Sequence, residues 1–548
     1  MKNLLRLALL LTASTAFAAG EPDAPKFDGD VPVFVEEALA AGIDHAYRGP
    51  WEFFVGGGVA VFDCDGDRRE DMLVAGGKGP ARLFVNRSPA GGALRFEERA
   101  LGVDERDRVN TLGAYPLDID NDGLKDVVLL RLGANVVLKG LPGCAFEKAN
   151  KAFAFDGGKA WTTAFSAIWE AESAFPTLAF GNYIDRAAPG SPFGTCDDNV
   201  LLRPQPGPNP DYSIETPLRP GWCALSMLFT DWAHVGEPAL RIANDRQYHR
   251  GGEEQLWRVP PGETPRLYGK ADGWEHLSIW GMGIAEGDLE GDGYPEYAIT
   301  SMGDNKLQKL SEEADEGQPT YRDIAWERGA TAFRPYALGD LKPSTGWHAE
   351  FDDVNNDGAL DLFIAKGNVE RMPDFAATDP DNLLIGGWDG RFAEKGGDAG
   401  VALPTKGRGG ALVDFNLDGM LDLVVVNREQ PLSLFRSTGA KTQWGARPMG
   451  NWLEIALSQD GPNRDAVGAT VSVKTGNRTV IRKVAVGGGH ASGHLGWVHV
   501  GAGAAERAEV RVQWPDGEWS APYRVFTGNF VLIDRKSTAA RYWYPPVE

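Results

Sequence analysis

Five acidic loops, repeated along the chain, constrain the fold more than any other feature of this sequence. Each loop follows a small apolar segment and precedes a second apolar segment. The loops begin at Asp63, Asp118, Asp288, Asp353 and Asp414, so successive starts lie 55, 170, 65 and 61 residues apart. Because 170 is about three periods of roughly 57 residues, two further copies are expected between Asp118 and Asp288.

Two degenerate copies occur in that interval. One begins at Ser166 and has lost most of its acids, and the other begins at Ser226 and keeps Asp231 and Gly236. Seven units then span residues 45–445. Units of about 57 residues with four short apolar segments are typical of β-propeller blades. We therefore predict an all-β fold with a seven-bladed β-propeller, and a solenoid of the same units is the structural alternative.

The composition of the loops predicts calcium binding. Carboxylates at loop positions 1, 3, 5 and 9 can converge on one cation, the carbonyl of position 7 adds an oxygen, and a glycine at position 6 allows the left-handed turn. A set of hard oxygen ligands favours calcium over zinc or copper. The predicted ligands are Asp63, Asp65, Asp67, Arg69 and Asp71; Asp118, Asp120, Asp122, Leu124 and Asp126; Asp288, Glu290, Asp292, Tyr294 and Glu296; Asp353, Asn355, Asp357, Ala359 and Asp361; and Asp414, Asn416, Asp418, Met420 and Asp422.

The rival interpretation is an EF-hand, which requires a glutamate at loop position 12. That position is apolar in all five loops, which excludes the EF-hand: Val74, Leu129, Ile299, Ile364 and Val425. About five calcium ions are expected. Weaker calcium binding is expected in the two loops where Asn355 and Asn416 replace an acid. The loop at Asp63 carries Arg68 at position 6, where the left-handed turn favours glycine.

The tail, residues 449–548, alternates apolar and polar residues between Gly-containing turns, which predicts a small antiparallel β domain. It contains an N-R-x-A-x-G-A segment at 463–469 and a W-P-D-G turn at 514–517.

These motifs resemble the ASPIC/UnbV domain, and the acidic loops resemble the FG-GAP (VCBS) repeats of integrin-α-like propellers. The combination is similar to the cartilage acidic protein 1 family, including its bacterial members. This resemblance implies a calcium-binding propeller, and it assigns no role to the His490–His494 stretch.

The N-terminus is typical of an export signal. Lys2 and Arg6 precede an apolar stretch that ends in a small-x-small site at 16–18. We expect a signal peptide at 1–18, a lead-in segment at 19–44 and a mature protein that is secreted or periplasmic without a membrane anchor. A buried N-terminal helix is the alternative.

Export permits disulfide bonds. The four cysteines allow three connectivities, which the sequence leaves open. Cys196 and Cys223 are the preferred pair, and Cys64 with Cys144 could form a second.

The functional prediction is a binding, adhesive or scaffolding protein stabilised by calcium. The formal net charge of −22 argues against a nucleic-acid partner, and an extracellular protein or a carbohydrate is the candidate ligand. No common catalytic motif occurs in the sequence. His490, His494 and His499 could serve a metal or a general-base role. The alternative function is an extracytoplasmic enzyme, a hydrolase or lyase, with its site in the propeller funnel.

Overall fold

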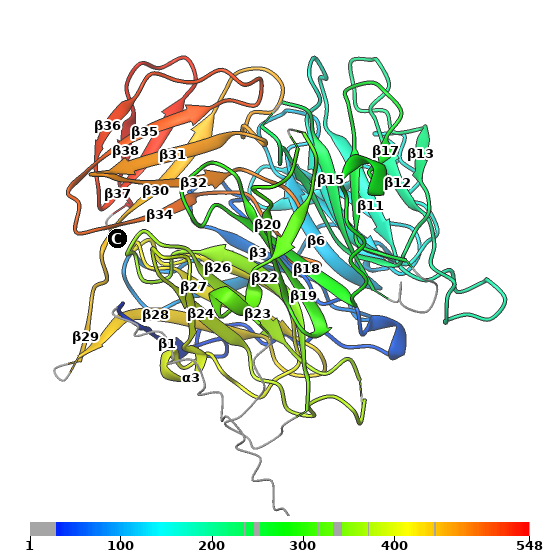
Figure 1. Cartoon of the computed structure of the whole chain (residues 1–548), viewed down its shortest axis with the longest axis horizontal. Helices are drawn as coiled ribbons and strands as arrows, with labels where there is room; N and C mark the ends of the chain where they lie inside the picture. The colour runs from blue at the N-terminus through cyan, green and yellow to red at the C-terminus, as the bar shows by residue number, and fades with distance from the viewer. Residues whose placement is uncertain are drawn as a thin grey trace, which may run out of the picture.

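The computed structural model describes residues 29–546 apart from 235, 246–251, 316, 332–341, 371 and 443–444. The expected signal peptide and the first part of the lead-in segment lie outside these residues. The described chain is nearly all β (Figure 1), which confirms that part of the fold prediction. Its helices are single turns: η1 (Trp51–Phe53), α1 (Glu105–Arg108), η3 (Lys270–Asp272), α2 (Ala325–Arg328) and α3 (Gly396–Ala399). Among the described residues, no helix has the length and apolar character to cross a bilayer.

Most strands belong to units of antiparallel strands that follow one another in chain order. The first four units are β2 (Val59–Phe62), β3 (Asp71–Val74), β4 (Arg82–Asn86) and β5 (Phe96–Arg99); β6 (Thr111–Leu117), β7 (Asp126–Arg131), β8 (Val136–Leu141) and β9 (Ala145–Lys148); β10 (Thr162–Ile168), β11 (Thr177–Asn182), β12 (Asn199–Leu202) and β13 (Glu215–Leu218); and β14 (Ala224–Thr230), β15 (Ala239–Asn244), β16 (Gln255–Arg258) and β17 (Arg266–Leu267).

The later units are β18 (Gly281–Gly287), β19 (Glu296–Gly303), β20 (Lys306–Leu310) and β21 (Tyr321–Asp323); β22 (Ser344–Asp352), β23 (Asp361–Lys366), β24 (Asn382–Gly386) and β25 (Phe392–Glu394); and β26 (Gly407–Val413), β27 (Asp422–Asn427) and β28 (Ser433–Thr442). The ends of β19 and β22 also pair, which joins two units into one sheet. The first strands of successive units contact one another, and β26 contacts β2.

The last of these units obtains its fourth strand from the N-terminus. β1 (Pro32–Glu36) pairs antiparallel with β28, with Phe34 opposite Ser437. On its other end β28 pairs with the short β29 (Gly445–Arg447). The predicted lead-in segment at 19–44 therefore contains a strand of the last unit. Its short apolar pattern carried no acidic loop by which a repeat could be recognised.

The core lies between neighbouring units. Strands that follow the acidic loops, such as β7 and β27, are buried on both faces, which explains their almost continuous apolar sequences. One apolar cluster combines side chains of the first two units, including Phe62, Leu83 and Val127. Fully burying each such side chain contributes about 1.5–3 kcal/mol.

The tail forms two four-stranded sheets, in the strand orders β34-β30-β37-β38 and β32-β31-β35-β36. Its strands are β30 (Asn451–Ser458), β31 (Thr470–Thr475), β32 (Arg478–Lys483), β33 (Gly493–His494), β34 (Val498–Gly503), β35 (Arg507–Gln513), β36 (Tyr523–Phe526), β37 (Asn529–Asp534) and β38 (Arg541–Trp543). β30 and β37 pair in parallel, so the prediction of a purely antiparallel domain is wrong. The alternation of apolar and polar residues indicates which face of a strand is buried, but it does not indicate whether the neighbouring strand is parallel or antiparallel.

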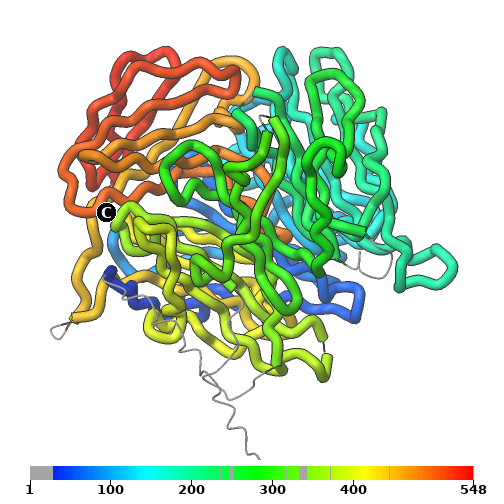
Figure 2. Tube along the Cα trace, viewed as in Figure 1, coloured from blue at the N-terminus to red at the C-terminus, as the bar shows by residue number. Residues whose placement is uncertain are grey.

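Between β32 and β34 the tail sends a segment against the first strands of several units; we call residues 486–495 the plug. In Figure 2 the orange part of the chain runs toward the middle of the molecule. The plug hydrogen-bonds to first strands around the ring. The Val486 carbonyl accepts from Ala167 of β10, and the Ala491 carbonyl accepts from Ala114 of β6. The Gly489 amide donates to Ile284 of β18, and β33 pairs in parallel with β2. The tail is therefore docked against the units through this segment.

Glycine makes this close approach possible. A Cβ placed on Gly58 of the first unit would lie 1.7 Å from the Ala491 carbonyl oxygen, and Gly487 in the plug has φ of +130°. The Gly-rich stretch, to which the sequence assigned no role, is therefore the part of the tail that fits between the first strands.

We predict that Gly58→Ala lowers the free energy of unfolding by about 1–3 kcal/mol, because the added methyl group displaces the plug from β2. Gly397→Ala is the control, since a Cβ there meets nothing within 4 Å, and we expect it to be neutral or slightly stabilising. Denaturant unfolding followed by tryptophan fluorescence measures both. Equal stability of the two variants would contradict a tightly packed plug.

Candidate metal-binding loops

The five acidic loops share one backbone conformation. Positions 4 and 6 are left-handed in every loop, with φ between 57° and 94°. These residues are Gly66 and Arg68, Asn121 and Gly123, Gly291 and Gly293, Asn356 and Gly358, and Leu417 and Gly419. Two left-handed residues so close together turn the backbone around the carboxylates of the loop. For a non-glycine residue this conformation costs about 1–2 kcal/mol.

Backbone amides orient the carboxylates in the same way in all five loops. The amide of position 6 donates to the aspartate at position 1 over 2.6–2.9 Å. The amide of position 7 donates to position 5 over 2.8–3.0 Å. The amide of position 2 donates to the acid at position 9 over 2.8–3.1 Å. Arg68 thus forms the same turn as the glycines, and its carbonyl accepts a bond from the Trp497 indole of the tail.

Several carboxylates of these loops are buried, which changes their pKa values. The acids at position 9 are at most 1% exposed. Burial raises the pKa of Glu296 and that of Asp353 to about 7, with nearby carboxylates adding to the effect, and it raises the pKa of Asp118 to about 6. Without a cation these three acids therefore take up protons at a higher pH than free carboxylates do. Because all the side-chain donors are hard oxygens, the set fits calcium, which would supply the missing positive charge.

The predicted ligands converge to different degrees. Carboxylate oxygens of Asp118, Asp120 and Asp122 lie within 4.8 Å of one another, as do those of Asp63, Asp65 and Asp71. The other three loops hold no such group of three acids among the described residues. Two of them have Asn355 or Asn416 at position 3, whose amide donates to the position-5 aspartate. The position-7 carbonyls of Arg69, Leu124, Tyr294, Ala359 and Met420 remain predicted ligands.

Basic side chains that the sequence analysis missed reach several loops. Lys139 of β8 bonds to Asp120 and Asp122, and Lys309 of β20 bonds to Glu290. Glu290 also pairs with Arg328. The two lysines occupy equivalent positions in their units. The residue after loop position 9 pairs with a residue of the third strand, Val127 with Leu138 and Tyr297 with Gln308, and the lysine comes directly after that partner. Aligning the third strands of the repeats would have found this signal.

The three histidines of the tail take separate positions. His490 lies in the plug against Trp347, with ring centroids 5.1 Å apart, and His494 is in β33. No metal-holding group of His, Cys, Asp or Glu in the described part of the chain includes any of the three. The idea that they share one metal is therefore not supported.

His499 of β34 instead links the tail to an acidic loop. Its Nδ1 lies 2.6 Å from Glu454 Oε1, and its Nε2 lies 2.7 Å from Asn356 Oδ1. The Asn356 amide nitrogen donates to the Gly419 carbonyl, so the oxygen faces the imidazole. Both ring nitrogens therefore carry protons. Burial lowers the pKa of His499, but the Glu454 carboxylate outweighs this and raises it to about 9.

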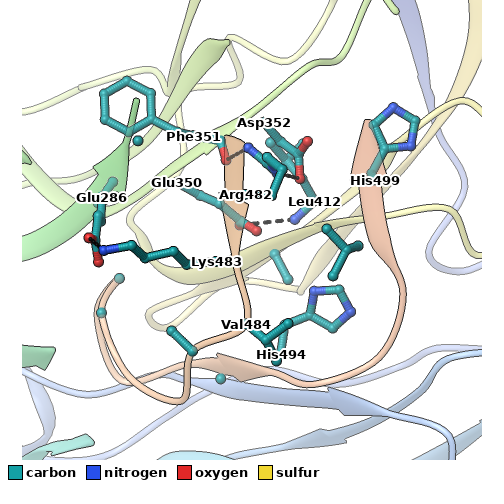
Figure 3. Close-up of a pocket in the computed structure, with 18 of the residues that line it drawn as sticks. Glu286, Glu350, Phe351, Asp352, Leu412, Arg482, Lys483, Val484, His494 and His499 are labelled. Carbon is teal, nitrogen blue, oxygen red and sulfur yellow. Dashed lines mark hydrogen bonds and ion pairs between the residues drawn. The ribbon is translucent and has the colours of Figure 1, made fainter. Parts of the chain in front are cut away.

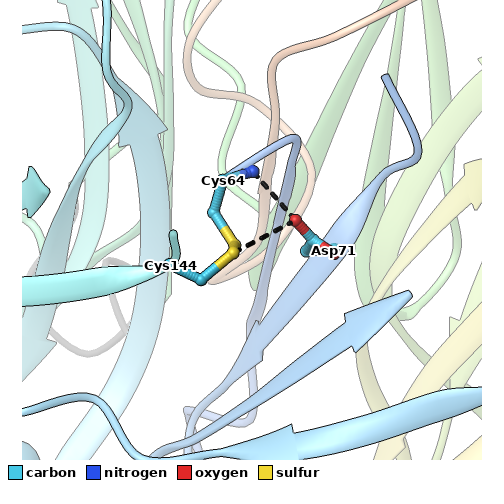
Figure 4. A group of neighbouring side chains, drawn as sticks. All are labelled: Cys64, Asp71 and Cys144. Atoms are coloured by element: carbon cyan, nitrogen blue, oxygen red, sulfur yellow. Dashed lines mark hydrogen bonds between the residues drawn. A yellow bond between two sulfur atoms is a disulfide. The ribbon is translucent and has the colours of Figure 1, made fainter. Parts of the chain in front are cut away.

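Two disulfides are present. Cys196 pairs with Cys223, and Cys64 pairs with Cys144 (Figure 4). The second bond ties the first acidic loop to the hairpin of the next unit, and the Cys64 amide donates to Asp71. Closing a loop of 80 residues stabilises the fold by about 4.5 kcal/mol in the chain-entropy model.

Comparisons with known proteins agree with both sequence resemblances. Residues 63–129 match the FG-GAP-like repeat, and residues 459–539 match the ASPIC and UnbV family. Cartilage acidic protein 1 of Xenopus tropicalis is 24% identical over 509 residues, covering 84% of this chain and 70% of that protein. The same protein of Mus musculus is 35% identical over 128 residues, covering 22% of this chain and 18% of its own length.

Among solved structures, BBS1N in complex with ARL6DN aligns over 76% of this chain and 99% of that one, with 10% identity and a TM-score of 0.43. This likeness is too low to assign a fold. The two sequence matches, together with the cartilage acidic protein 1 relatives, support the family predicted from the loops and the tail.

We predict that chelated protein gains stability as the pH falls from about 7 to about 5. The pKa values of Asp118, Glu296 and Asp353 are raised in the folded state, so in this interval the folded chain binds more protons than the unfolded chain. Denaturant unfolding at successive pH values tests this, and Asp353→Asn should give a shallower slope. A loss of stability on acidification of the chelated protein would contradict it.

We predict that His499→Phe lowers the free energy of unfolding by about 3–5 kcal/mol, because it leaves Glu454 buried without a cation. A second change, Glu454→Gln, should recover much of this loss. His276→Phe is the control: His276 pairs with Glu253 but is 57% exposed, so its loss should cost less than about 1 kcal/mol. The contribution of His499 is complete below pH 6.5 and is lost as the pH rises through about 9.

Proposed function

We propose that this member of the cartilage acidic protein 1-like family is an exported seven-bladed β-propeller protein that binds calcium through its acidic loops. Calcium serves as a structural staple within the blades. The protein acts as an adhesive, scaffolding or ligand-binding module outside the cytoplasm, with an extracellular protein or a carbohydrate as its partner.

The arrangement of the strands supports the propeller. Units of four antiparallel strands follow one another from β2 to β28, and β1 supplies the last strand of the final unit. Contact between β26 and β2 brings the last unit against the first. A ring closed by strands from both ends of the propeller sequence leaves few strand edges exposed, in contrast to an open solenoid.

The common geometry of the five loops is the observation that carries the calcium proposal. The loops differ in sequence, yet the same left-handed turns and the same hydrogen bonds from backbone amides orient their carboxylates alike. At a free calcium concentration ten times the dissociation constant, each site would stabilise the fold by about 1.4 kcal/mol. Placed in a loop between the first two strands of a unit, each ion would hold one hairpin.

Two disulfides support export, because such bonds persist in oxidising compartments. The net charge of −22 supports a partner other than nucleic acid. The plug narrows the funnel in which the alternative hypothesis placed an active site, because its backbone hydrogen-bonds to β6, β10 and β18. This observation favours a binding role over an enzyme of that kind.

The experiment is thermal unfolding of the mature protein in millimolar calcium and after chelation, with bound ions counted by calorimetry. We expect about four or five ions and a melting temperature that falls by many degrees on chelation, since the sites bind only the folded chain. Asp361→Asn should remove about one ion from the count. No bound calcium and no change in melting temperature would refute the proposal.

A further inference from the structure

A partly open cavity lies between the tail and the first strands of the ring (Figure 3). Its volume is about 220 Å³, enough for a small ligand. The end of β18 contributes Glu286, and β22 contributes Glu350 and Asp352. The tail contributes Lys483 of β32 and His494 of β33. The cavity therefore exists only because the two parts of the chain are docked.

Most charges that line the cavity are already paired. Glu286 accepts from Lys483 Nζ over 2.9 Å, and Asp352 lies 2.5 Å from the Arg482 guanidinium. Glu454 is bonded to the His499 imidazolium. These three carboxylates and three cations balance one another. Glu70, Asp288, Glu350 and Asp414 also line the cavity, and no Lys or Arg of the described chain forms an ion pair with them, so carboxylates are in excess.

Glu350 is one of these unpaired acids. Its Oε2 accepts from the Leu412 amide over 3.0 Å and lies 3.2 Å from His348 Nε2. His348 Nδ1 accepts the His490 amide, so its single ring proton is on Nε2 and the imidazole is neutral. Both donors to Glu350 are therefore uncharged. No Lys or Arg of the described chain forms an ion pair with this carboxylate, and its Oε1 has no hydrogen-bond partner there.

Two further groups in the cavity wall lack partners. His494 Nε2 has no hydrogen bond, and burial lowers the pKa of this imidazole. Glu70 is 2% exposed and its Oε2 is also unpartnered. Unpartnered buried polar atoms cost about 1–3 kcal/mol each, and natural structures usually satisfy them with a bound molecule or water. Here both belong to the same wall as the uncompensated Glu350.

We propose that this cavity binds a small organic ammonium compound, with Glu350 as the counter-ion of the ammonium group and His494 as an additional hydrogen-bond partner. The Glu350 side chain is only 21% exposed, and a cation beside a partly buried carboxylate is favourable. The volume admits a compact aliphatic amine and excludes a sugar chain or a peptide. The proposal does not depend on the adhesive role, and Asp288 and Asp414 of the acidic loops also line the cavity.

Titration calorimetry with the four-carbon diamine putrescine tests the site, on full-length mature protein saturated with calcium so that the acidic loops are filled. We expect one equivalent to bind. Butanediol of the same chain length, which lacks the charge, should not bind. Glu350→Gln keeps an oxygen for the Leu412 and His348 donors but removes the charge, and should weaken putrescine binding by at least about tenfold, or about 1.4 kcal/mol.

Glu312→Gln is the matched control, because Glu312 is an exposed acid in a turn; this variant should bind as the unchanged protein does. Ala485→Leu fills the cavity without altering charge and should also weaken binding, so the test survives if Glu350→Gln fails to fold. Absence of putrescine binding, equal binding of the diol, or equal losses in Glu312→Gln and Glu350→Gln would overturn the proposal.

Discussion

The backbone polar groups at the centre of the ring set the main constraint on this structure. First strands have a sheet partner on one side only, so their inner N–H and C=O groups need other partners where water is excluded. The plug supplies them: Val486, Ala491 and Gly489 bond to β10, β6 and β18. The tail is therefore part of the ring's own hydrogen bonding. This arrangement explains why glycine occupies both sides of the contact, since a side chain at Gly58 would separate the two backbones.

A second constraint acts at the acidic loops. Each loop brings buried carboxylates together and holds them with backbone amides, a set of partners that orients the oxygens but leaves their charge uncompensated. The chain offsets part of this charge with Lys139, Lys309 and Arg87. A divalent cation would complete the compensation. Because the loops join the first two strands of their units, metal binding and the geometry of the ring are linked.

His499 connects these two constraints. It joins Glu454 of the tail to Asn356, and Asn356 in turn bonds to Gly419 of the next acidic loop. Two loops and the tail thus share one buried imidazolium. Docking of the tail also creates the cavity around Glu350, so displacement of the plug would disturb the ring, the loops and the cavity together.

The sequence alone determined the features that local spacing encodes. Acids at fixed positions around Gly123 or Gly358 can adopt only a tight, oxygen-lined turn, and the repeat of this pattern predicted successive β units and the family resemblance. The sequence pattern did not reveal strand direction, since β30 pairs in parallel with β37. Apolar and polar residues alternate in the same way whether the neighbouring strand is parallel or antiparallel. Nor did the sequence reveal the origin of β1, whose short pattern resembles no repeat.

Only the tertiary structure decided how distant segments meet. The Gly-rich stretch of the tail has no local motif, and its fit depends on strands from several units, including β2, β6, β10 and β18. The pairing of His499 with Glu454, the lysines at the loops and the cavity beside Glu350 likewise arise from residues far apart in the chain. The sequence specified the loops because their ligands lie within nine residues; it left the plug and the cavity unspecified because their partners come together only when the ring closes.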